Sequence, residues 1–458
     1  MSHEVRIGTL SLGGSNPLRL QSMTTAATTD TAACVRQIRS IVDAGGDLVR
    51  LTTQGLREAE NLRDIKRALK GSRYASVPLV ADVHFNPAVA DAAAAIVEKV
   101  RINPGNYVDP ARRFKHVAYT EEEYRAELVR LEARFLQLLA ICRQHGTALR
   151  IGVNHGSLSD RIMSRYGDTP AGIVESCMEF LRICMREQFR DVVVSIKASN
   201  TVVMVQSVRL LSQRMAEEGM DYPLHLGVTE AGEGEDGRIK SACGIGALLT
   251  EGLGDTIRVS LSEDPEFEIP VARLLADSVQ ECTRLRAEAL ASIADDTVTL
   301  RMDETDWEML QIKTAMAVGG LFIDRKAHKL VLESPRFPDS QLADLADRIL
   351  QATRIKFTRT EYISCPGCGR TLYNLQETIA RIKAATPHLK GLKIGIMGCI
   401  VNGPGEMADA DYGYVGAARG RISLYRGKEC VEKNIPEAEA VEKLLALIAR
   451  DAAERKEK

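Results

Sequence analysis

Short apolar runs alternate with longer amphipathic segments between residues 18 and 290. The runs are six to eight residues long, as expected of strands buried on both faces. They cover Leu18–Met23, Asp47–Thr53, Pro78–Phe85, Lys99–Pro104, Ala148–Asn154, Asp191–Ala198, Leu224–Glu230 and Thr256–Ser262. Helical periodicity follows each run, over Thr31–Ala44, Glu58–Lys70, Pro87–Val97, Glu121–His145, Pro170–Glu187, Thr201–Gly219, Ile239–Gly252 and Pro270–Leu290. Eight strand–helix pairs predict a (β/α)₈ barrel; a doubly wound open sheet, the alternative, more usually stops at about five or six strands.

Beyond residue 290 the pattern changes twice. Residues 291–360 contain the only tryptophan and two helical stretches, near Glu304–Ala317 and Asp339–Thr353, and predict a small connecting region without visible chemistry. From Glu361 the order strand, helix, strand, glycine-rich loop, hairpin and helix predicts a compact α+β domain. Its predicted elements include a helix at Leu372–Ala384, a strand at Leu392–Met397, a hairpin at Tyr412–Val431 and a helix at Pro436–Arg450. We therefore divide the chain into residues 1–290, 291–360 and 361–458.

Two loops of the last domain carry the strongest chemical signal. Cys365 and Cys368 flank a Pro-Gly turn that can direct both thiolates at one metal centre, and Cys399 follows in a second Gly- and Pro-rich loop. Three thiolates favour an iron–sulfur cluster over structural zinc, which closes with four nitrogen or sulfur ligands. Glu406 is the preferred fourth, displaceable ligand. Cys430, in a stretch typical of an ordinary strand, is the spare candidate, and a zinc ribbon is the alternative for the first two cysteines.

Cationic residues mark the predicted C-terminal ends of the barrel strands, where barrels of this type carry their chemistry. Alternate residues of a strand share a face, so Arg150 points the same way as Asn154, and Arg258 the same way as Ser260. The polar residues of these strand ends are Arg50, Arg101, Asn103, Arg150, Asn154, Lys197, Arg258 and Ser260.

Burying several like charges costs several kcal/mol per ion unless each finds a partner. The carboxylates Asp82, Glu230 and Asp255 are too few to neutralise this set. Ion pairs that brace the barrel would account for one or two of the cations. A phosphate or diphosphate ligand accounts for the set, because arginine gives bidentate contacts to such groups.

Three further patterns near the strands allow a functional or an ordinary interpretation. Glu230 ends the seventh strand and could act as a general acid beside a diphosphate, or simply pair with an arginine. Each of the histidines at 84, 155 and 225 is more often structural than catalytic. Glycines 232, 234 and 237 satisfy the dinucleotide-binding spacing, but three acidic residues among them would repel a pyrophosphate. We discount that motif.

Composition limits the classes of partner. The chain of 458 residues has 60 Lys plus Arg against 62 Asp plus Glu, and its net charge of −2 gives no global attraction to nucleic acid or anionic membranes. We see neither a signal peptide nor an apolar run of about 18 residues that would span a membrane. The other cysteines are scattered through helical patterns and indicate a reducing compartment, so we expect a cytoplasmic protein.

Taken together, these motifs resemble the family of 4-hydroxy-3-methylbut-2-enyl diphosphate synthases, enzymes of the methylerythritol phosphate route to isoprenoids. The matching stretches are Gln21–Thr24, Val49–Thr52, Arg101–Asn106, Arg150–Ser157, Lys197–Asn200, Gly227–Gly232 and Ser364–Arg370, and the match continues past Glu406. The sequences of Asn154–Ser164 and of Glu230–Asp236 are similar to those of the larger, plant-like branch of the family.

The resemblance implies a [4Fe–4S] cluster on Cys365, Cys368, Cys399 and Glu406, in a domain like those of sulfite and nitrite reductases. It implies the substrate 2-C-methyl-D-erythritol 2,4-cyclodiphosphate. Two electrons from ferredoxin or flavodoxin would open the ring, Glu406 would step aside from the iron, and Glu230 would protonate the departing hydroxyl. The expected substrate-binding residues are Arg50, Arg101, Arg150, Asn154, Lys197, Thr229, Arg258 and Ser260.

Residues 291–360 depart from the family pattern, because the plant-like branch has a large extra domain there and the short bacterial branch only a linker. In the short branch the cluster domain of one subunit caps the barrel of the other, so we expect a homodimer. Two other classes stay open. One is a diphosphate-handling barrel similar to dihydropteroate synthase with a structural zinc module. The other is a cluster-bearing sensor that binds nucleic acid, against which the net charge and the lack of a basic stripe argue.

Overall fold

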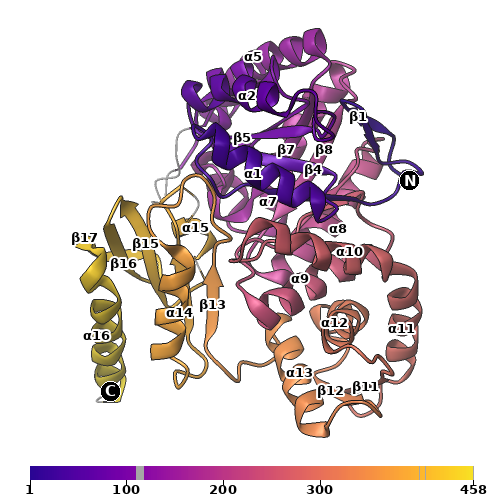
Figure 1. Ribbon diagram of the computed structural model, residues 1–458, viewed down its shortest axis with the longest axis vertical. Coiled ribbons are helices and arrows are strands. Elements are labelled where there is room, and N and C mark those ends of the chain that lie inside the picture. Colours follow the sequence, from indigo (N-terminus) through magenta and orange to yellow (C-terminus); the bar gives the residue numbers. More distant parts are fainter. Residues whose placement is uncertain (110–117, 402, 408, 457–458) are drawn as a thin grey trace.

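The computed structural model describes residues 1–109, 118–401, 403–407 and 409–456. A parallel eight-stranded sheet forms its upper part in Figure 1, in the strand order β8-β7-β6-β5-β4-β3-β10-β9. A parallel bridge between Val194 and Leu224 joins the two ends of that order and closes the ring. The strands are β3 (Arg19–Met23), β4 (Leu48–Thr53), β5 (Leu79–Val83), β6 (Lys99–Ile102), β7 (Ala148–Asn154), β8 (Val192–Lys197), β9 (His225–Leu226) and β10 (Thr256–Ile257). The predicted barrel is confirmed, and the open-sheet alternative is wrong.

Helices surround this barrel because the outward side chains of its strands are apolar. On β7, Leu149, Ile151 and Val153 are fully buried, and the polar residues between them face the interior. The helix predicted at Pro270–Leu290 is split at Ser278, and the helix predicted to start at Ile239 already begins at Gly234. The helices of this part are α1 (Thr31–Asp43), α2 (Leu56–Leu69), α3 (Pro87–Ala94), α4 (Pro104–Tyr107), α5 (Glu121–His145), α6 (Asp160–Tyr166), α7 (Pro170–Arg186), α8 (Thr201–Glu217), α9 (Gly234–Leu249), α10 (Glu268–Asp277) and α11 (Val279–Ala291), with short 3₁₀ turns η1 (His155–Ser157) and η2 (Pro265–Phe267).

An N-terminal hairpin, β1 (Val5–Ile7) and β2 (Leu10–Leu12), covers the end of the barrel where the strands begin. Its apolar side chains form one buried cluster with inward residues of four strands, among them Leu48 and Val80. Since this end is closed by apolar packing, polar chemistry is confined to the opposite mouth.

The middle segment forms a βαβα unit, with β11 (Thr297–Arg301), α12 (Trp307–Ile323), β12 (Lys329–Glu333) and α13 (Asp339–Ala352). The two helical stretches of the predicted connecting region are present, whereas its two parallel strands were not predicted. Each strand buries only two side chains and ends in a charged residue, which weakens its apolar signal. Helix α12 packs along α9 and shares the hydrophobic core of the barrel.

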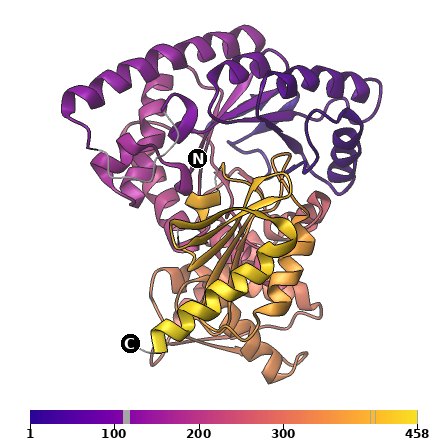
Figure 2. The same cartoon turned by 90° about the vertical axis from the view of Figure 1, so that its left-hand side faces the viewer.

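The C-terminal domain is built on a five-stranded sheet in the order β13-β14-β15-β16-β17. The predicted hairpin consists of three strands rather than two, and helix α16 lies across one face of the sheet (Figure 2). Its elements are β13 (Glu361–Ser364), α14 (Leu375–Ala385), β14 (Lys393–Met397), α15 (Gly403–Glu406), β15 (Tyr412–Ala418), β16 (Arg421–Arg426), β17 (Glu429–Pro436) and α16 (Glu437–Lys456). None of the helices in the described ranges combines the length and the apolar character needed to cross a membrane.

The seam between α9 and α12 generates a prediction with a matched control. A Cβ at Gly319 would lie 2.7 Å from the Cα of Cys243, whereas one at the adjacent Gly320 would meet the Cβ of Ala247 at an ordinary 3.4 Å. We expect Gly319→Ala to lower the free energy of unfolding by about 1–3 kcal/mol through overpacking. Gly320→Ala should raise it by up to about 1 kcal/mol, since alanine favours the helix. Urea unfolding measures both, and equal effects of the two substitutions would contradict the packing described.

Candidate functional site

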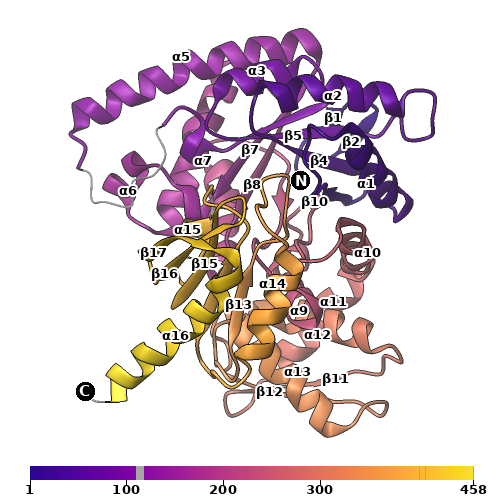
Figure 3. The ribbon, with the colours of Figure 1, turned by 60° about the vertical axis from the view of Figure 1, so that its left-hand side comes forward.

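One cavity lies between the carboxyl ends of the barrel strands and the two cysteine loops. In Figure 3 the loops above β13 and β14 reach up to the barrel strands of the same chain. The cavity is lined by Met23, Arg50, Asp82, His84, Arg101, Asn154, Lys197, Thr229, Glu230, Arg258, Ser260, Cys365, Pro366, Gly367, Cys368, Arg370, Met397, Gly398, Cys399 and Gly403. Eleven of the predicted site residues are therefore brought together.

Direct contacts hold the C-terminal domain against the barrel. The Ser262 hydroxyl donates to the Cys365 carbonyl at 2.9 Å, and a parallel bridge joins Ala231 to Ser364. The Ser199 hydroxyl donates to the Glu406 carbonyl at 2.8 Å. The cysteine loops thus sit on the barrel of their own chain, and the homodimer, expected from capping between subunits, stays a prediction.

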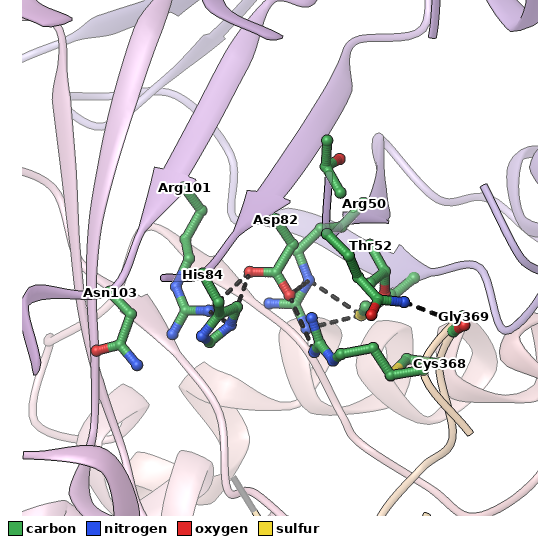
Figure 4. A network of polar contacts seen from close by, with 12 residues as sticks. Arg50, Thr52, Asp82, His84, Arg101, Asn103, Cys368 and Gly369 are labelled. Carbon is green, nitrogen blue, oxygen red and sulfur yellow. Dashed lines mark hydrogen bonds and ion pairs between the residues drawn. The ribbon is translucent and has the colours of Figure 1, made fainter. Parts of the chain in front are cut away.

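Asp82 on β5 is the carboxylate around which the cations of the mouth gather (Figure 4). Arg101 Nη1 donates to Asp82 Oδ1 at 2.7 Å, and Arg50 Nε and Arg370 Nη2 lie 3.9 and 3.7 Å from Asp82 Oδ2. Although burial opposes ionisation, Arg101 and Arg50 hold the pKa of Asp82 well below its usual range. One buried carboxylate therefore serves three arginines.

His84, on the same strand end, is neutral and structural. Its Nε2 lies 2.6 Å from Arg101 Nη1, and because arginine only donates, this nitrogen accepts and the ring proton sits on Nδ1. The Asn106 amide 3.2 Å from Nδ1 then presents its oxygen. Burial and the Arg101 charge lower the pKa of His84 well below its ordinary value. His155 pairs with Asp168, and the buried His225 contacts the Thr256 hydroxyl, in line with the structural interpretation.

Arg258 has a fixed partner that the sequence did not reveal. Glu268, at the start of α10, accepts from Arg258 Nη2 at 2.8 Å and from Nε at 3.0 Å, and also from the Ser22 hydroxyl at 2.6 Å. Arg258 is thus one of the expected bracing ion pairs. Asp255 is not at the mouth as predicted: it lies at the start of β10, where it accepts from the Leu224 amide and the Ser2 hydroxyl.

Three further cations have no carboxylate of their own. Burial lowers the pKa of Lys197 well below its ordinary value, and the nearby arginines lower it further. Burial lowers the pKa of Arg50 to about 10, and its guanidinium hydrogen-bonds the Met23 sulfur. Arg150 is fully buried, with Nε and Nη1 unpartnered among the described residues, but it is not one of the residues that line the cavity. The mouth therefore holds more positive charge than its own carboxylates balance.

The three predicted cysteines face this charge from the other side of the cavity. The Cys365 sulfur accepts from the Gly398 amide at 3.2 Å, and burial raises the pKa of its thiol to about 12. Burial also raises the pKa of the Cys399 thiol, and the nearby Cys368 raises it further. Across the described part of the chain, no three His, Cys, Asp or Glu side chains come close enough to hold a single ion, as a zinc site requires. Three thiols on one cavity are a donor set that suits an iron–sulfur cluster, whose thiolates bind different irons. Cys430 lies on β17, outside the cavity.

Glu406 and Glu230 meet where α15 touches the barrel. Thr229, predicted to bind substrate, donates its hydroxyl to Glu406 Oε2 at 2.8 Å. Burial raises the pKa of Glu230, and burial together with the neighbouring Glu230 raises that of Glu406 well above its usual range. Glu230 adopts a φ of 48°, in the left-handed region, which a residue without glycine's freedom occupies at some cost. The pair thus retains a proton beside the cavity.

Comparison with known proteins identifies the family. The description "GcpE TIM-barrel domain" matches residues 2–273, and "GcpE protein C-terminal domain" matches residues 361–450. The chain belongs to the GcpE family. Two relatives carry the name 4-hydroxy-3-methylbut-2-en-1-yl diphosphate synthase (flavodoxin). That of Bacteroides thetaiotaomicron is 49% identical, with 98% of each chain covered, and that of Porphyromonas gingivalis is 44% identical, with 97% of this chain and 96% of the relative covered.

The GcpE relatives are longer than this chain. The alignment with the Bacteroides thetaiotaomicron protein spans 599 residues, more than the 458 present here, so that relative has residues for which this chain has no counterpart. Residues 274–360 match neither family description. A solved sialic acid synthetase from Leptospira borgpetersenii has a TM-score of 0.38 at 12% identity, covering 62% of this chain and 90% of its own, which is too low to add to the assignment.

Sequence reasoning missed three residues of this site, Met23, Glu268 and Arg370. Arg370 directly follows the Cys-x-x-Cys turn, and that position was the available signal. The acidic residues between the glycines of the discounted dinucleotide motif have structural partners: Glu233 pairs with Lys383 at 3.0 Å, and Asp236 pairs with Arg348.

The Arg258–Glu268 pair generates a prediction about stability. Glu268→Gln removes the charge that neutralises a guanidinium of 3% exposure, and we expect a loss of about 3–5 kcal/mol in the free energy of unfolding. The control Glu288→Gln removes a charge from the exposed pair with Arg284 and should change stability by less than about 0.5 kcal/mol. Denaturant unfolding distinguishes them, and similar values for both would show that the buried pair is not required.

Proposed function

We propose that this chain catalyses the reductive ring opening and dehydration of 2-C-methyl-D-erythritol 2,4-cyclodiphosphate to 4-hydroxy-3-methylbut-2-enyl diphosphate. The observation that carries the proposal is one cavity lined both by unbalanced cations and by three cysteines. The name shared by full-length relatives supports the same reaction. A diphosphate supplies the negative charge that the barrel lacks, and the cysteines provide the place for a redox centre.

The cations of the mouth would bind the diphosphate in different ways. Lys197 has no carboxylate within ion-pairing distance among the described residues, Arg50 shares Asp82 with two other arginines, and both side chains line the cavity. Arg101 is oriented by Asp82 and Arg258 by Glu268, so these two guanidinium groups are held in place before the ligand arrives. Asn154 and Ser260 add neutral donors. Arg150 lies behind the residues that line the cavity, and its charge would attract the diphosphate without direct contact. Preorganised donors of this kind stabilise charge without rearrangement.

Cys365, Cys368 and Cys399 would hold a [4Fe–4S] cluster, with Glu406 as the exchangeable fourth ligand. When bound, such a cluster supplies electrons one at a time and offers an iron for a substrate oxygen. Glu406 now accepts from Thr229, which is the position this carboxylate would take when it is not a ligand. Flavodoxin, named in the relatives, is the donor we propose, with ferredoxin as the alternative.

Glu230 would supply the proton for the departing hydroxyl. Its burial favours the protonated form, and its Oε2 has no hydrogen-bond partner among the described residues. The backbone bend at Glu230 places the carboxyl at the cavity wall between the barrel and the cysteine loops. These are the requirements of a general acid: a retained proton and access to the reacting group.

We further propose the division into a barrel (1–290), a middle segment (291–360) and a cluster domain (361–458). Core side chains of the middle segment pack in the same cluster as those of the barrel, which supports a bracing role for this segment rather than an independent domain.

The decisive experiment is anaerobic purification followed by iron and acid-labile sulfide analysis and an assay with the cyclodiphosphate. We expect about four irons and four sulfides per chain, and turnover with reduced flavodoxin. Glu406→Ala should weaken retention of the cluster while the barrel stays folded. One zinc without sulfide would overturn the proposal and favour the zinc-module barrel.

Substitution of Glu230 tests the acid role. Glu230→Gln keeps the shape of the side chain but has no acidic proton, so kcat should fall by about 10²- to 10⁴-fold while KM changes little. The control is Glu233→Gln on the same loop, whose partner Lys383 lies outside the cavity. It should leave kcat within about twofold, and an unchanged kcat in Glu230→Gln would remove this residue from the acid role.

A further inference from the structure

Arg370 enters the cavity from the cluster domain, and the roles derived above do not include it. Its side chain is 9% exposed, and its Nη2 lies 3.7 Å from Asp82 Oδ2 on β5. Among the described residues that line the cavity, it is the one cation contributed by residues 361–458. An arginine of the cluster domain is therefore buried among the cations of the barrel mouth.

The backbone around Arg370 is seated on the barrel, so the position of its side chain is not accidental. A Cβ at Gly369 would lie 3.0 Å from the Ala26 carbonyl, which follows β3. The Gln54 amide, just after β4, donates to the Gly369 carbonyl at 3.4 Å. Within the loop, the Thr371 amide donates to the Cys368 carbonyl at 2.9 Å. The loop that carries Arg370 is thus packed against the barrel, and this packing places the side chain in the cavity.

The guanidinium of Arg370 has an unused donor in this position. A separation of 3.7 Å from Asp82 is too long for a hydrogen bond, and Asp82 already accepts from Arg101. Arg370 Nε is buried without a partner among the described residues, while the guanidinium also contacts Cys399. A buried guanidinium with unused donors needs an acceptor, and an anion in the cavity would supply one.

We propose that Arg370 is a diphosphate-binding residue supplied by the cluster domain, and that it couples ligand binding to the docking of that domain on the barrel. The proposal rests on the proposed function in that the anion is a diphosphate. Because the ligand would contact both domains, it would strengthen their docking by the same factor by which docking strengthens ligand binding. The barrel cations alone would then bind the diphosphate only partly.

Calorimetry with inorganic pyrophosphate, on the anaerobically purified protein with its cluster loaded, tests this coupling. We expect Arg370→Gln to weaken pyrophosphate binding at least tenfold. Arg370→Lys should fall in between, because lysine keeps the charge but not the planar fork. Arg419→Gln removes the same charge from an exposed position of the same domain and should bind as the unaltered protein does.

Hydrogen exchange provides a readout that a purely structural role would not change. In the unaltered protein, pyrophosphate should slow exchange in the segments on both sides of the contact, residues 24–28 of the barrel and 365–371 of the loop. In Arg370→Gln this slowing should be lost, although the cluster absorption and the free-state exchange are retained. If Gln disturbs the cluster, the same comparison is made with Arg370→Lys.

Unchanged pyrophosphate affinity in both Arg370 variants, or slowing that persists in them, would overturn the inference. The proposed function fails separately: its failure is a lack of turnover and of cluster in the unaltered protein. A protein that converts the cyclodiphosphate and whose Arg370 variants bind pyrophosphate normally would keep the proposed function and lose this inference.

Discussion

Excess positive charge buried at the barrel mouth is the constraint on which the rest of this structure depends. Asp82 is shared by three arginines, and Glu268 neutralises only Arg258. Each further cation in this low-dielectric space raises the free energy of the folded chain until an anion arrives. The folded barrel is therefore destabilised by this charge until an anion binds. At the opposite end, the apolar cluster beneath the N-terminal hairpin holds the strands together.

The same charge explains why the cluster domain can close on the mouth. Thiols in a buried apolar place hold their protons, as the pKa of Cys365 indicates. Beside arginines, a metal-bound thiolate set is electrostatically favoured. Close approach is possible because glycines meet at the seam: a Cβ at Gly405 would lie 1.7 Å from the Gly156 carbonyl, and one at Gly156 2.4 Å from the Glu406 backbone nitrogen. The missing side chains let the two surfaces touch.

The periodicity of apolar residues predicted the elements whose formation depends on neighbouring residues in the sequence. All eight barrel strands and helix α5 were found from periodicity, because their residues are buried on the faces that the pattern marks. Strands β11 and β12 were missed, since a two-stranded edge with one exposed face gives hardly any apolar run. Strand ends likewise indicated the cations of the mouth. Pairing did not follow from the sequence: Glu268 comes from the next helix, Asp255 lies at the wrong end of its strand, and Arg370 reaches Asp82 of β5 from the C-terminal domain.

The middle segment determines which barrel the cluster domain reaches. Helix α12 is fixed on α9 by glycine contacts, and α13 places Arg348 against Asp236 in the first turn of α9. The chain then enters β13, where Glu361 pairs with Lys240 of α9 at 3.2 Å. The start of the cluster domain is thus held beside its own barrel, within reach of the mouth. A relative carries additional residues, whereas here a short βαβα unit leads the chain from the barrel to β13. In this chain, the contact of Glu361 with α9 fixes the starting point of β13 and keeps the C-terminal domain on its own barrel.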